Sequence, residues 1–384
     1  MKGSVEKRGM TKKGLAWRLT VYGGQSLGTK YRRFRKTVYC DKKSEAEKEL
    51  ARFIMEIEKG EFTEPTTLSF EAFVAMWHQN YAKQHLSPTT YEKYERHLIS
   101  RIIPAFGHFR LGQIQTIHVV EFVSKLSKSH IKSATQNDIY KVLRNVLSRA
   151  TEWNLINKNP CNNVKPPKVK HQKSNVYDSS EYRLLVEKLK IESIQHQVLV
   201  LLAVACGLRR GEILGLQWDD IDINTKTIYI KHSLLIKKGS GYELREPKTE
   251  SSVRKVIYPS ELLDIPLKKL KKEQLEKRIK CGELYEADEH FFVLSSWAGK
   301  PLRPDSVTQW WGRFTKRTGI KNIRFHDLRH TSATLLINAG VHAKTISERL
   351  GHSDIKITMN VYGHHLKEAD QKSADVFSQL ALNE

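Results

Sequence analysis

The stretch that decides how this chain is interpreted spans residues 205–216 and reads ACGLRRGEILGL, followed directly by QWDDI. It begins inside the apolar run Val198 to Cys206, which is far shorter than the roughly 20 residues that a membrane span needs. Arg209 stands beside this apolar segment, and Glu212 follows one helical turn later, where its carboxylate is better placed to orient the guanidinium than to act as an acid or base. An isolated arginine in such a place usually forms a structural ion pair. The rest of the chain therefore decides whether Arg209 is functional.

Two further polar clusters follow in the same part of the chain. The first reads HDLRHT and spans His326 to Thr331. The second reads LGHS at residues 350–353, and Tyr362 comes ten residues after His352. The sequence thus supplies arginines, histidines and a tyrosine in separate, ordered clusters.

These residue types fit attack on a phosphodiester. Its transition state gathers charge on the non-bridging oxygens, which guanidinium groups match in geometry while staying charged at any relevant pH. A tyrosine phenol has a pKa of about 10, so it needs deprotonation or an activated phosphate, and neighbouring histidines help. The leaving 5′ oxygen needs a proton, which a mobile lysine can donate. The sequence has no G-x-x-x-x-G-K-[ST] loop and no clustered carboxylates for two metal ions, so neither ATP, metal nor another cofactor is expected.

The clusters together resemble the signature of the tyrosine recombinase family, the phage integrase type. That signature is an arginine in a G-x-R-x-x-E context, then H-x-x-R, then G-H, then a tyrosine nucleophile. The resemblance covers roughly residues 174–380 and rests on several elements in the right order and spacing. It implies that the catalytic residues are Arg209, His326, Arg329, His352 and the nucleophile Tyr362, with Glu212 in support.

Family members also carry a catalytic lysine on a β-hairpin between the first arginine and the H-x-x-R motif. Here the sequence PKT at residues 247–249 precedes a strand-like stretch from Val253 to Tyr258, which identifies Lys248 as the counterpart. Lys255 and the pair Lys237-Lys238 lie in the same strand-rich patch between Thr227 and Pro259 and remain alternatives.

Charge and cysteine content limit which binding partners and which cellular compartment are expected. Lys and Arg number 65 against 42 Asp and Glu, a formal net charge of +23, which attracts polyanions such as nucleic acid. The four cysteines show no C-x-x-C pair or metal-ligand spacing, which argues against structural zinc and a disulfide framework. The basic N-terminus leads into no apolar segment, so no signal peptide and no membrane association are expected. We expect a cytoplasmic protein that joins the nucleoid when it binds DNA.

Residues 1–65 combine a strong basic excess with strand and helix patterns. Residues 15–22 and 31–39 have the composition of strands, with a turn at Gly23-Gly24. An apolar stripe at helical spacing, Leu50 to Ile57, comes next. A small sheet packed on one helix is predicted, and its basic side chains could enter a DNA groove. The candidate DNA contacts here are Arg18, Lys30, Arg32, Arg33, Arg35 and Lys36.

Residues 66–167 show helical periodicity. Phe70, Phe73, Val74 and Trp77 form one apolar stripe, and a second helix is expected to begin at Ser87-Pro88. The stretch from Asn159 to Lys173 is rich in proline and lysine and is predicted to be an exposed linker. Lys83, Lys93 and Arg96 are further candidate DNA contacts.

These patterns predict a multidomain protein, mainly α with small β-sheets. The resemblance assigns residues 1–65 to an α+β arm-binding domain, residues 66–167 to an all-α, SAM-like core-binding domain, and residues 174–384 to a mixed, mainly α catalytic domain. Simpler relatives that resolve chromosome dimers lack the first of these. The extra domain therefore favours integration and excision of a phage or conjugative mobile element.

The resemblance also implies the reaction and its partners. A site-specific recombinase of this type cleaves and rejoins DNA through a 3′-phosphotyrosine and a Holliday junction, as a homotetramer on core-type and arm-type sites of double-stranded DNA. An excisionase and a host DNA-bending protein are expected accessory partners. Two alternatives stay open: a type IB topoisomerase-like enzyme that relaxes DNA, and a non-enzymatic DNA-binding regulator with the same fold.

Overall fold

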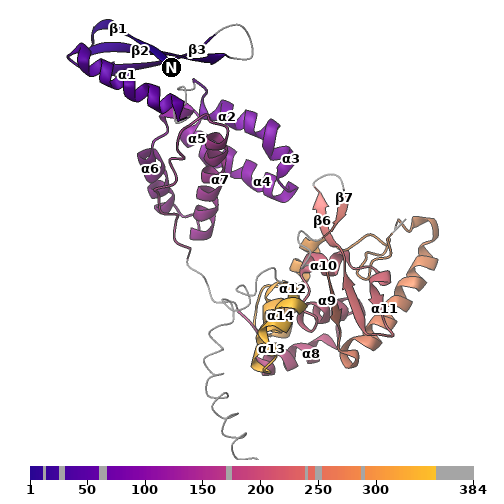
Figure 1. The fold of residues 1–384 in the computed structure, drawn as a ribbon. Coiled ribbons are helices and arrows are strands. Elements are labelled where there is room, and N and C mark those ends of the chain that lie inside the picture. The colour runs from indigo at the N-terminus through magenta and orange to yellow at the C-terminus, as the bar shows by residue number, and fades with distance from the viewer. Residues whose placement is uncertain are drawn as a thin grey trace, which may run out of the picture. The chain divides into compact units, whose positions relative to one another are not determined.

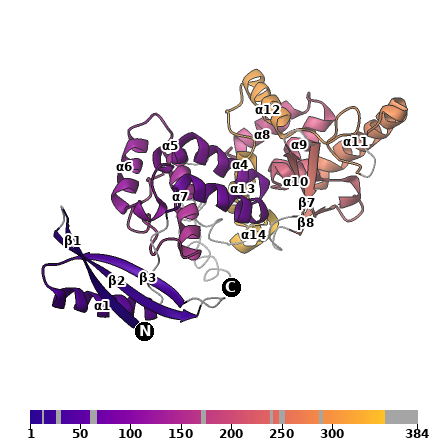
Figure 2. The same ribbon diagram turned by 90° about the horizontal axis from the view of Figure 1, so that it is seen from above.

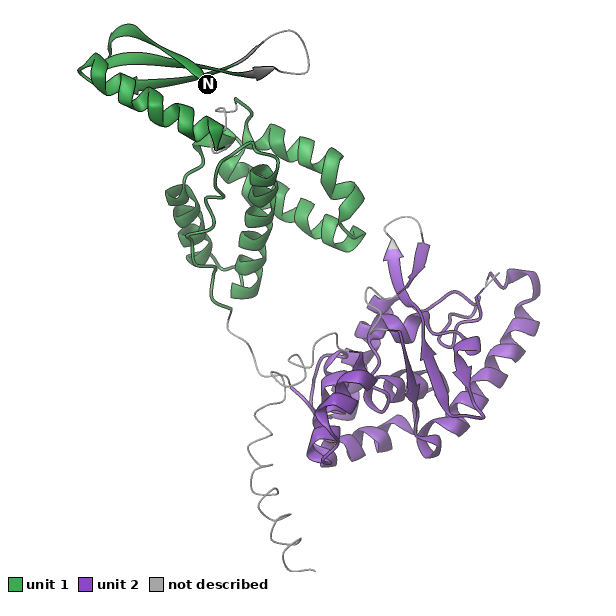
Figure 3. Ribbon diagram, in the orientation of Figure 1, with its two compact units in different colours: residues 1–171 green, residues 172–384 purple. Residues whose placement is uncertain are grey.

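The computed structural model describes residues 1–11, 14–25, 31–59, 67–169, 175–237, 241–246, 253–286 and 290–351. The chain separates into two compact units, residues 1–171 and 172–384 (Figure 3). The first unit contains two separate hydrophobic cores, one formed by residues from the first 57 positions and one by residues 70–161. The predicted boundaries near residues 65 and 174 fall outside the described residues, so the three-domain division stays a prediction.

In the N-terminal part, three antiparallel strands lie against one helix (Figures 1 and 2). Alternate strand residues point to the same face, so Trp17, Leu19 and Val21 of the central strand are all buried. They pack in one core with Phe53 and Ile57 of the helix. The small sheet on one helix is as predicted. The elements are β1 (Lys2–Thr11), β2 (Gly14–Gln25), β3 (Tyr31–Tyr39) and α1 (Lys43–Glu58).

Two details of this part differ from the sequence prediction. Strand β1 is additional, because its run of polar residues gives no strand pattern. The predicted turn at Gly23-Gly24 is wrong, since β2 continues to Gln25 with a shift in register after Tyr22. A Cβ on Gly23 would lie 2.7 Å from Cε2 of Phe34, so this glycine makes room for a neighbouring aromatic ring rather than for a turn.

Residues 67–169 are mainly helical, as predicted. The stripe of Phe70, Phe73, Val74 and Trp77 is buried against residues of the long helix α7. Two short π-helical turns, η1 and η2, continue the helices that precede them without a break. The elements are α2 (Phe70–Trp77), η1 (His78–Ala82), α3 (Lys83–His85), α4 (Pro88–His97), η2 (Leu98–Ile102), α5 (Ile103–Phe106), η3 (Leu111–Gln113), α6 (Thr116–Ser127) and α7 (Ser133–Glu152).

The predicted exposed linker begins later than Asn159. The Asn159 side chain donates to the carbonyl of Arg144 (2.9 Å) and to Ser148 Oγ (2.8 Å), and it is 5 % exposed. The Tyr140 hydroxyl donates to the carbonyls of Cys161 and Val164. These contacts fasten residues 159–164 to α7, so the stretch belongs to the helical core, and the irregular linker segment begins only after Val164.

The second unit is built of helices around two small antiparallel sheets, β4-β5-β8 and the hairpin β6-β7. The mainly helical fold with small sheets agrees with the predicted class. The elements are α8 (Ser179–Leu189), α9 (Ile194–Val204), α10 (Arg210–Gly215), η4 (Trp218–Asp220), β4 (Ile221–Asp222), β5 (Thr227–Ile230), β6 (Ser233–Lys237), β7 (Gly241–Arg245), β8 (Arg254–Ile257), α11 (Ser260–Cys281), η6 (Gly282–Leu284), α12 (Pro304–Thr318), α13 (Asp327–Asn338) and α14 (Ala343–Leu350).

Helix α9 is the centre of this unit. All residues from Val198 to Val204 are buried, so the helix is apolar on every side and packs against α10, α11 and α13. Helix α14 contacts both α13 and β8. The starts of α10, β8 and α13 border this main core, whereas Ile346 and Leu350 of α14 pack with Ala333 of α13 in a small second core. None of the described helices is both long and apolar enough to cross a membrane.

Candidate active site

Arg209 and Glu212 form the first part of the site, at the start of α10. The backbone N–H of Arg209 donates to Glu212 Oε2 (2.9 Å), and Arg209 Nη1 donates to Glu212 Oε1 (2.7 Å). The Glu212 side chain is 4 % exposed and that of Arg209 is 36 % exposed. The carboxylate therefore closes the first helical turn and holds a guanidinium that still reaches solvent.

Arg254, the first residue of β8, binds the same carboxylate. Its Nη1 and Nη2 donate to Glu212 Oε1 (3.1 Å) and Oε2 (2.9 Å), and its side chain is 6 % exposed. Burial by itself would raise the pKa of Glu212, but the hydrogen bonds and charge of Arg254, followed by the charge of Arg209, lower this pKa below its usual value. Glu212 is thus a buried carboxylate shared by two arginines.

Sequence reasoning missed Arg254, although a signal was present. Val256 is buried within the strand and Arg254 lies two residues before it, on the same face. An arginine on the buried face of a strand needs an anionic partner, because an unpaired buried charge is strongly unfavourable. What the sequence could not tell was which carboxylate, among many, is that partner.

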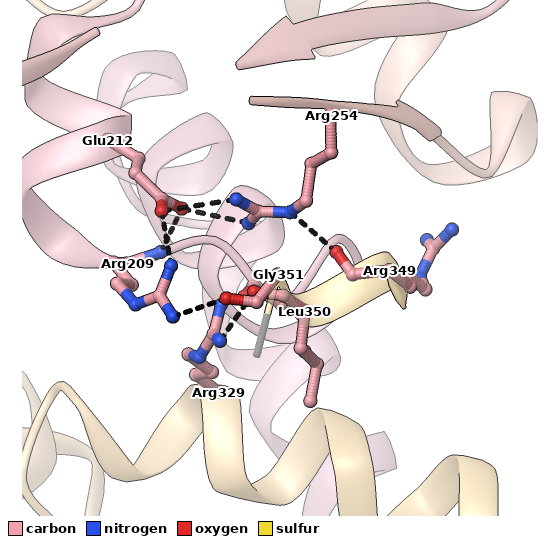
Figure 4. A network of polar contacts seen from close by, with 8 residues as sticks. Arg209, Glu212, Arg254, Arg329, Arg349, Leu350 and Gly351 are labelled. Atoms are coloured by element: carbon pink, nitrogen blue, oxygen red, sulfur yellow. Dashed lines mark hydrogen bonds and ion pairs between the residues drawn. The ribbon is translucent and has the colours of Figure 1, made fainter. Parts of the chain in front are cut away.

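Arg329 occupies the first turn of α13 and is 3 % exposed. Its Nη1 donates to the carbonyl of Gly207 (2.6 Å) and its Nη2 to the carbonyl of Leu350 (2.5 Å). These two bonds connect α13 to the turn before Arg209 and to the end of α14 (Figure 4). A second arginine is in this way placed within the same small network as the first.

The end of α14 completes the network. Arg209 Nη2 donates to the carbonyl of Gly351 (2.7 Å), a residue 142 positions further along the chain. Gly351 has a φ of 65°, the left-handed conformation that commonly ends a helix and that glycine adopts without strain. The predicted second histidine, His352, is the next residue in the sequence after Gly351.

His326 lies just before α13 and is exposed to solvent on one side, while the rest of its ring faces protein. Desolvation by the surrounding protein, followed by His330 and Arg329, lowers its pKa to about 4. The ring centroids of His326 and His330 are 5.2 Å apart, in an edge-to-face arrangement. In this state of the protein the imidazole is neutral at pH 7, and one of its nitrogens is available to accept a proton.

Lys248, His352 and Tyr362 lie outside the described residues, as do Lys30 and Lys238. Of the alternatives to Lys248, Lys255 is exposed, with Nζ 5.4 Å from the Tyr229 ring centroid, and Lys237 ends β6. The lysine and the nucleophile therefore stay sequence predictions.

The candidate DNA contacts in the first unit lie in two places, on the N-terminal sheet and on the helices that follow it. Arg18 lies on β2, whereas Arg32, Arg33, Arg35 and Lys36 lie on β3. Two lysines already have acidic partners: Lys36 pairs with Glu56 (3.0 Å) and Lys93 with Asp138 (2.6 Å). The remaining described candidates with exposed side chains are Arg33, Arg35, Lys83 and Arg96.

The guanidinium groups of Arg209, Arg254 and Arg329 outnumber the single Glu212 carboxylate that lies among them, so this cluster has a net positive charge (Figure 4). Within the described contacts Arg209 uses two of its five guanidinium N–H donors, and it is the exposed member, so it is able to bind an anion from solvent. The neighbouring Cys206 is no nucleophile, because burial raises the pKa of its thiol to about 12. The arrangement has the charge and the hydrogen-bond donors that are needed to bind an oxyanion.

The chain is similar to known proteins over most of its length. The family model described as "Phage integrase family" matches residues 175–369, and the one described as "Phage integrase, N-terminal SAM-like domain" matches residues 69–127. A tyrosine recombinase XerC-like protein of Caldanaerobacter subterraneus subsp. tengcongensis is 28 % identical over 95 % of this chain and 96 % of its own length. The ICEBs1 integrase of Bacillus subtilis is 28 % identical over 77 % of this chain and 79 % of its own length.

Solved structures share the fold. A Tn1549 transposon integrase in complex with a circular intermediate DNA aligns with a TM-score of 0.66 at 20 % identity, covering 79 % of this chain and 98 % of that one. A lambda integrase tetramer bound to a Holliday junction aligns with a TM-score of 0.55 at 16 % identity, covering 85 % and 89 %.

Proposed function

This chain belongs to the phage integrase family, the site-specific tyrosine recombinases, and from this premise we propose that it integrates and excises a mobile DNA element with Tyr362 as its nucleophile. The observation that carries the proposal is the convergence of Arg209 and Arg329 on one turn. Arg209 binds the carbonyl of Gly351 and Arg329 that of Leu350, directly before His352 in the sequence.

In the proposed reaction a scissile phosphate binds beside the arginines, which hold its non-bridging oxygens and stabilise the charge of the transition state. The phenol oxygen of Tyr362 attacks phosphorus, and the bond from phosphorus to the 5′ oxygen breaks. Lys248 protonates the departing 5′ oxygen. His326 and His352 assist deprotonation of the phenol, a role that suits the neutral imidazole of His326 at pH 7.

The phosphotyrosine keeps the energy of the broken bond, so religation needs no nucleotide. The 5′-hydroxyl of a partner duplex attacks the phosphotyrosine and displaces the tyrosine. Two such exchanges through a Holliday junction join two DNA sites. We propose that a homotetramer performs them on double-stranded DNA in the cytoplasm. This proposal is supported by the DNA and Holliday junction complexes of the fold relatives.

Residues 1–65 make the proposal specific to a mobile element. Their sheet carries a row of basic residues on β3, which suits binding to a second class of DNA site, the arm site. An excisionase and a host DNA-bending protein would then set the direction of the reaction. One of the fold relatives is the integrase of the Tn1549 transposon, which agrees with an element-borne enzyme.

The proposal is tested with a suicide duplex made from the chromosomal junction of the element that carries this gene, nicked near the crossover so that the freed 5′ end diffuses away. The wild-type protein is expected to form a covalent adduct that resists denaturing electrophoresis, and Tyr362→Phe is expected to form none. An undiminished adduct from the Phe variant disproves the assignment of the nucleophile. Relaxation of supercoiled plasmid without any element site favours the topoisomerase-like alternative instead.

A further inference from the structure

Arg254 joins three segments of the site through one side chain. Its Nε donates to the carbonyl of Arg349 in α14 (2.7 Å), while Nη1 and Nη2 take both oxygens of Glu212 in α10. Figure 4 shows the guanidinium between the carboxylate and the end of α14. The strand β8 is thereby bound to two elements that border predicted catalytic residues.

The turn at Gly351 is shaped to accept this side chain. A Cβ added to Gly351 would lie 2.9 Å from Arg254 Nη1 and 3.0 Å from its Cδ. The Arg254 side chain therefore occupies the space that any other residue at position 351 would need. Two arginines therefore contact this turn: Arg254 lies beside the Cα of Gly351, and Arg209 donates to the Gly351 carbonyl (2.7 Å).

The charge balance of the cluster gives Arg254 a second task. Glu212 is almost fully buried, and with Arg209 as its only partner the carboxylate would cancel the positive charge of that guanidinium. Arg254 supplies a second positive charge on both carboxylate oxygens. The charge of Arg209 is then left for an incoming phosphate, while the Arg254 side chain itself is only 6 % exposed.

We infer that Arg254 is a positioning residue for DNA cleavage. It compensates the charge of Glu212 and keeps the Arg209 guanidinium beside the Gly351 turn. The inference rests on the proposed function, because it assumes that Arg209 binds the scissile phosphate. It adds a buried residue that acts through the Glu212 carboxylate and the end of α14. In the sequence Arg254 also closely follows Lys248, so it anchors the strand at the end of the segment that carries the predicted general acid.

The test measures the rate of adduct formation on the suicide duplex, with the full-length protein at a temperature where every variant remains folded. Arg254→Met is expected to lower the rate by roughly 10²-fold, the effect of losing an oxyanion-binding group, because Arg209 is no longer held in place; DNA affinity is expected to change little. Adding Glu212→Gln to Arg254→Met removes the uncompensated carboxylate and is expected to restore the rate by roughly tenfold. Arg254→Lys, which keeps the charge but not the paired geometry, is expected to fall between wild type and Arg254→Met.

A second duplex carries a methylphosphonate at the scissile position, which removes the negative charge that the arginines neutralise. The defects of Arg254→Met and of Arg209→Ala are both expected to shrink on this substrate. Arg278→Met, an arginine exposed on α11, is the matched control and is expected to cleave both duplexes like the wild type.

The outcomes separate the two claims. If the wild type forms no adduct, or Arg209→Ala cleaves as fast as the wild type, the proposed function fails. If those two proteins behave as expected but Arg254→Met cleaves at the wild-type rate, the positioning role is overturned. It is equally overturned if Arg254→Met is impaired to the same degree on both duplexes and Glu212→Gln gives no rescue, because that pattern indicates general loss of structure.

Discussion

The guanidinium of Arg254 lies where a side chain on Gly351 would have to go: a Cβ at position 351 would be 2.9 Å from Arg254 Nη1. Two constraints therefore favour glycine at position 351 of the LGHS motif: the positive φ of the residue and the arginine side chain that packs against it. The Arg254 side chain in β8 thus limits the size of the residue at position 351, at the end of α14.

Gly351→Ala is expected to lower the free energy of unfolding by about 1–2 kcal/mol, because alanine is strained in the left-handed conformation and its Cβ displaces Arg254. Urea denaturation followed by circular dichroism measures the change. Combining it with Arg254→Met relieves the steric part, so the two effects are expected to be less than additive. Strictly additive effects would show that the contact between positions 254 and 351 contributes no interaction free energy.

The low pKa of His326 predicts a pH dependence of stability. The folded protein keeps this imidazole neutral down to about pH 4, whereas the unfolded chain binds a proton near the ordinary value of 6.5. Unfolding therefore takes up a proton between these limits, and the free energy of unfolding decreases as the pH falls through this window. NMR titration of the histidine ring gives the midpoint directly. His326→Gln is expected to have a shallower loss of stability, and an NMR midpoint at 6.5 in the folded protein would contradict the assignment.

Cysteine reactivity offers a test of the core around the site. Burial raises the pKa of both Cys161 and Cys206 to about 12, so neither forms a thiolate at neutral pH. Cys281 is only partly buried. Iodoacetamide labelling followed by mass spectrometry is expected to modify Cys281 well before the other two, with cleavage activity retained. Rapid native-state labelling of Cys206 would mean that helix α9 is not packed as described.

Removal of residues 1–65 is expected to separate cleavage from integration. Among the residues that the structure describes, the N-terminal core of Trp17, Leu19 and Phe53 shares no buried residue with the core of residues 70–161, so the remaining protein is expected to keep its own packing. Adduct formation on the suicide duplex is expected to persist, while integration between complete attachment sites is lost. The measurement is a plasmid integration assay beside the adduct assay. Equal integration by the truncated protein would remove the basis for an arm-binding role.

Much of the fold was predictable because its signals are local. Apolar periodicity is a property of neighbouring residues, so the stripe from Phe70 to Trp77, the helix beginning at Pro88 and two strands of the N-terminal sheet all follow from short segments. Errors arose where a local signal had a distant cause. Gly23 signals a turn, yet it is a glycine because Phe34 covers it, and Asn159 signals a linker, yet its amide binds α7.

The sequence by itself predicted the chemistry of the site, since Arg209, His326, Arg329, His352 and Tyr362 resemble the signature of the phage integrase family and suit attack on a phosphodiester. Only the tertiary structure decided which groups meet. Arg254 binds the carbonyl of a residue 95 positions away, and Arg209 one 142 positions away. No local pattern encodes such pairings, because they arise when separate elements pack around α9 and a buried charge must find its partner among them.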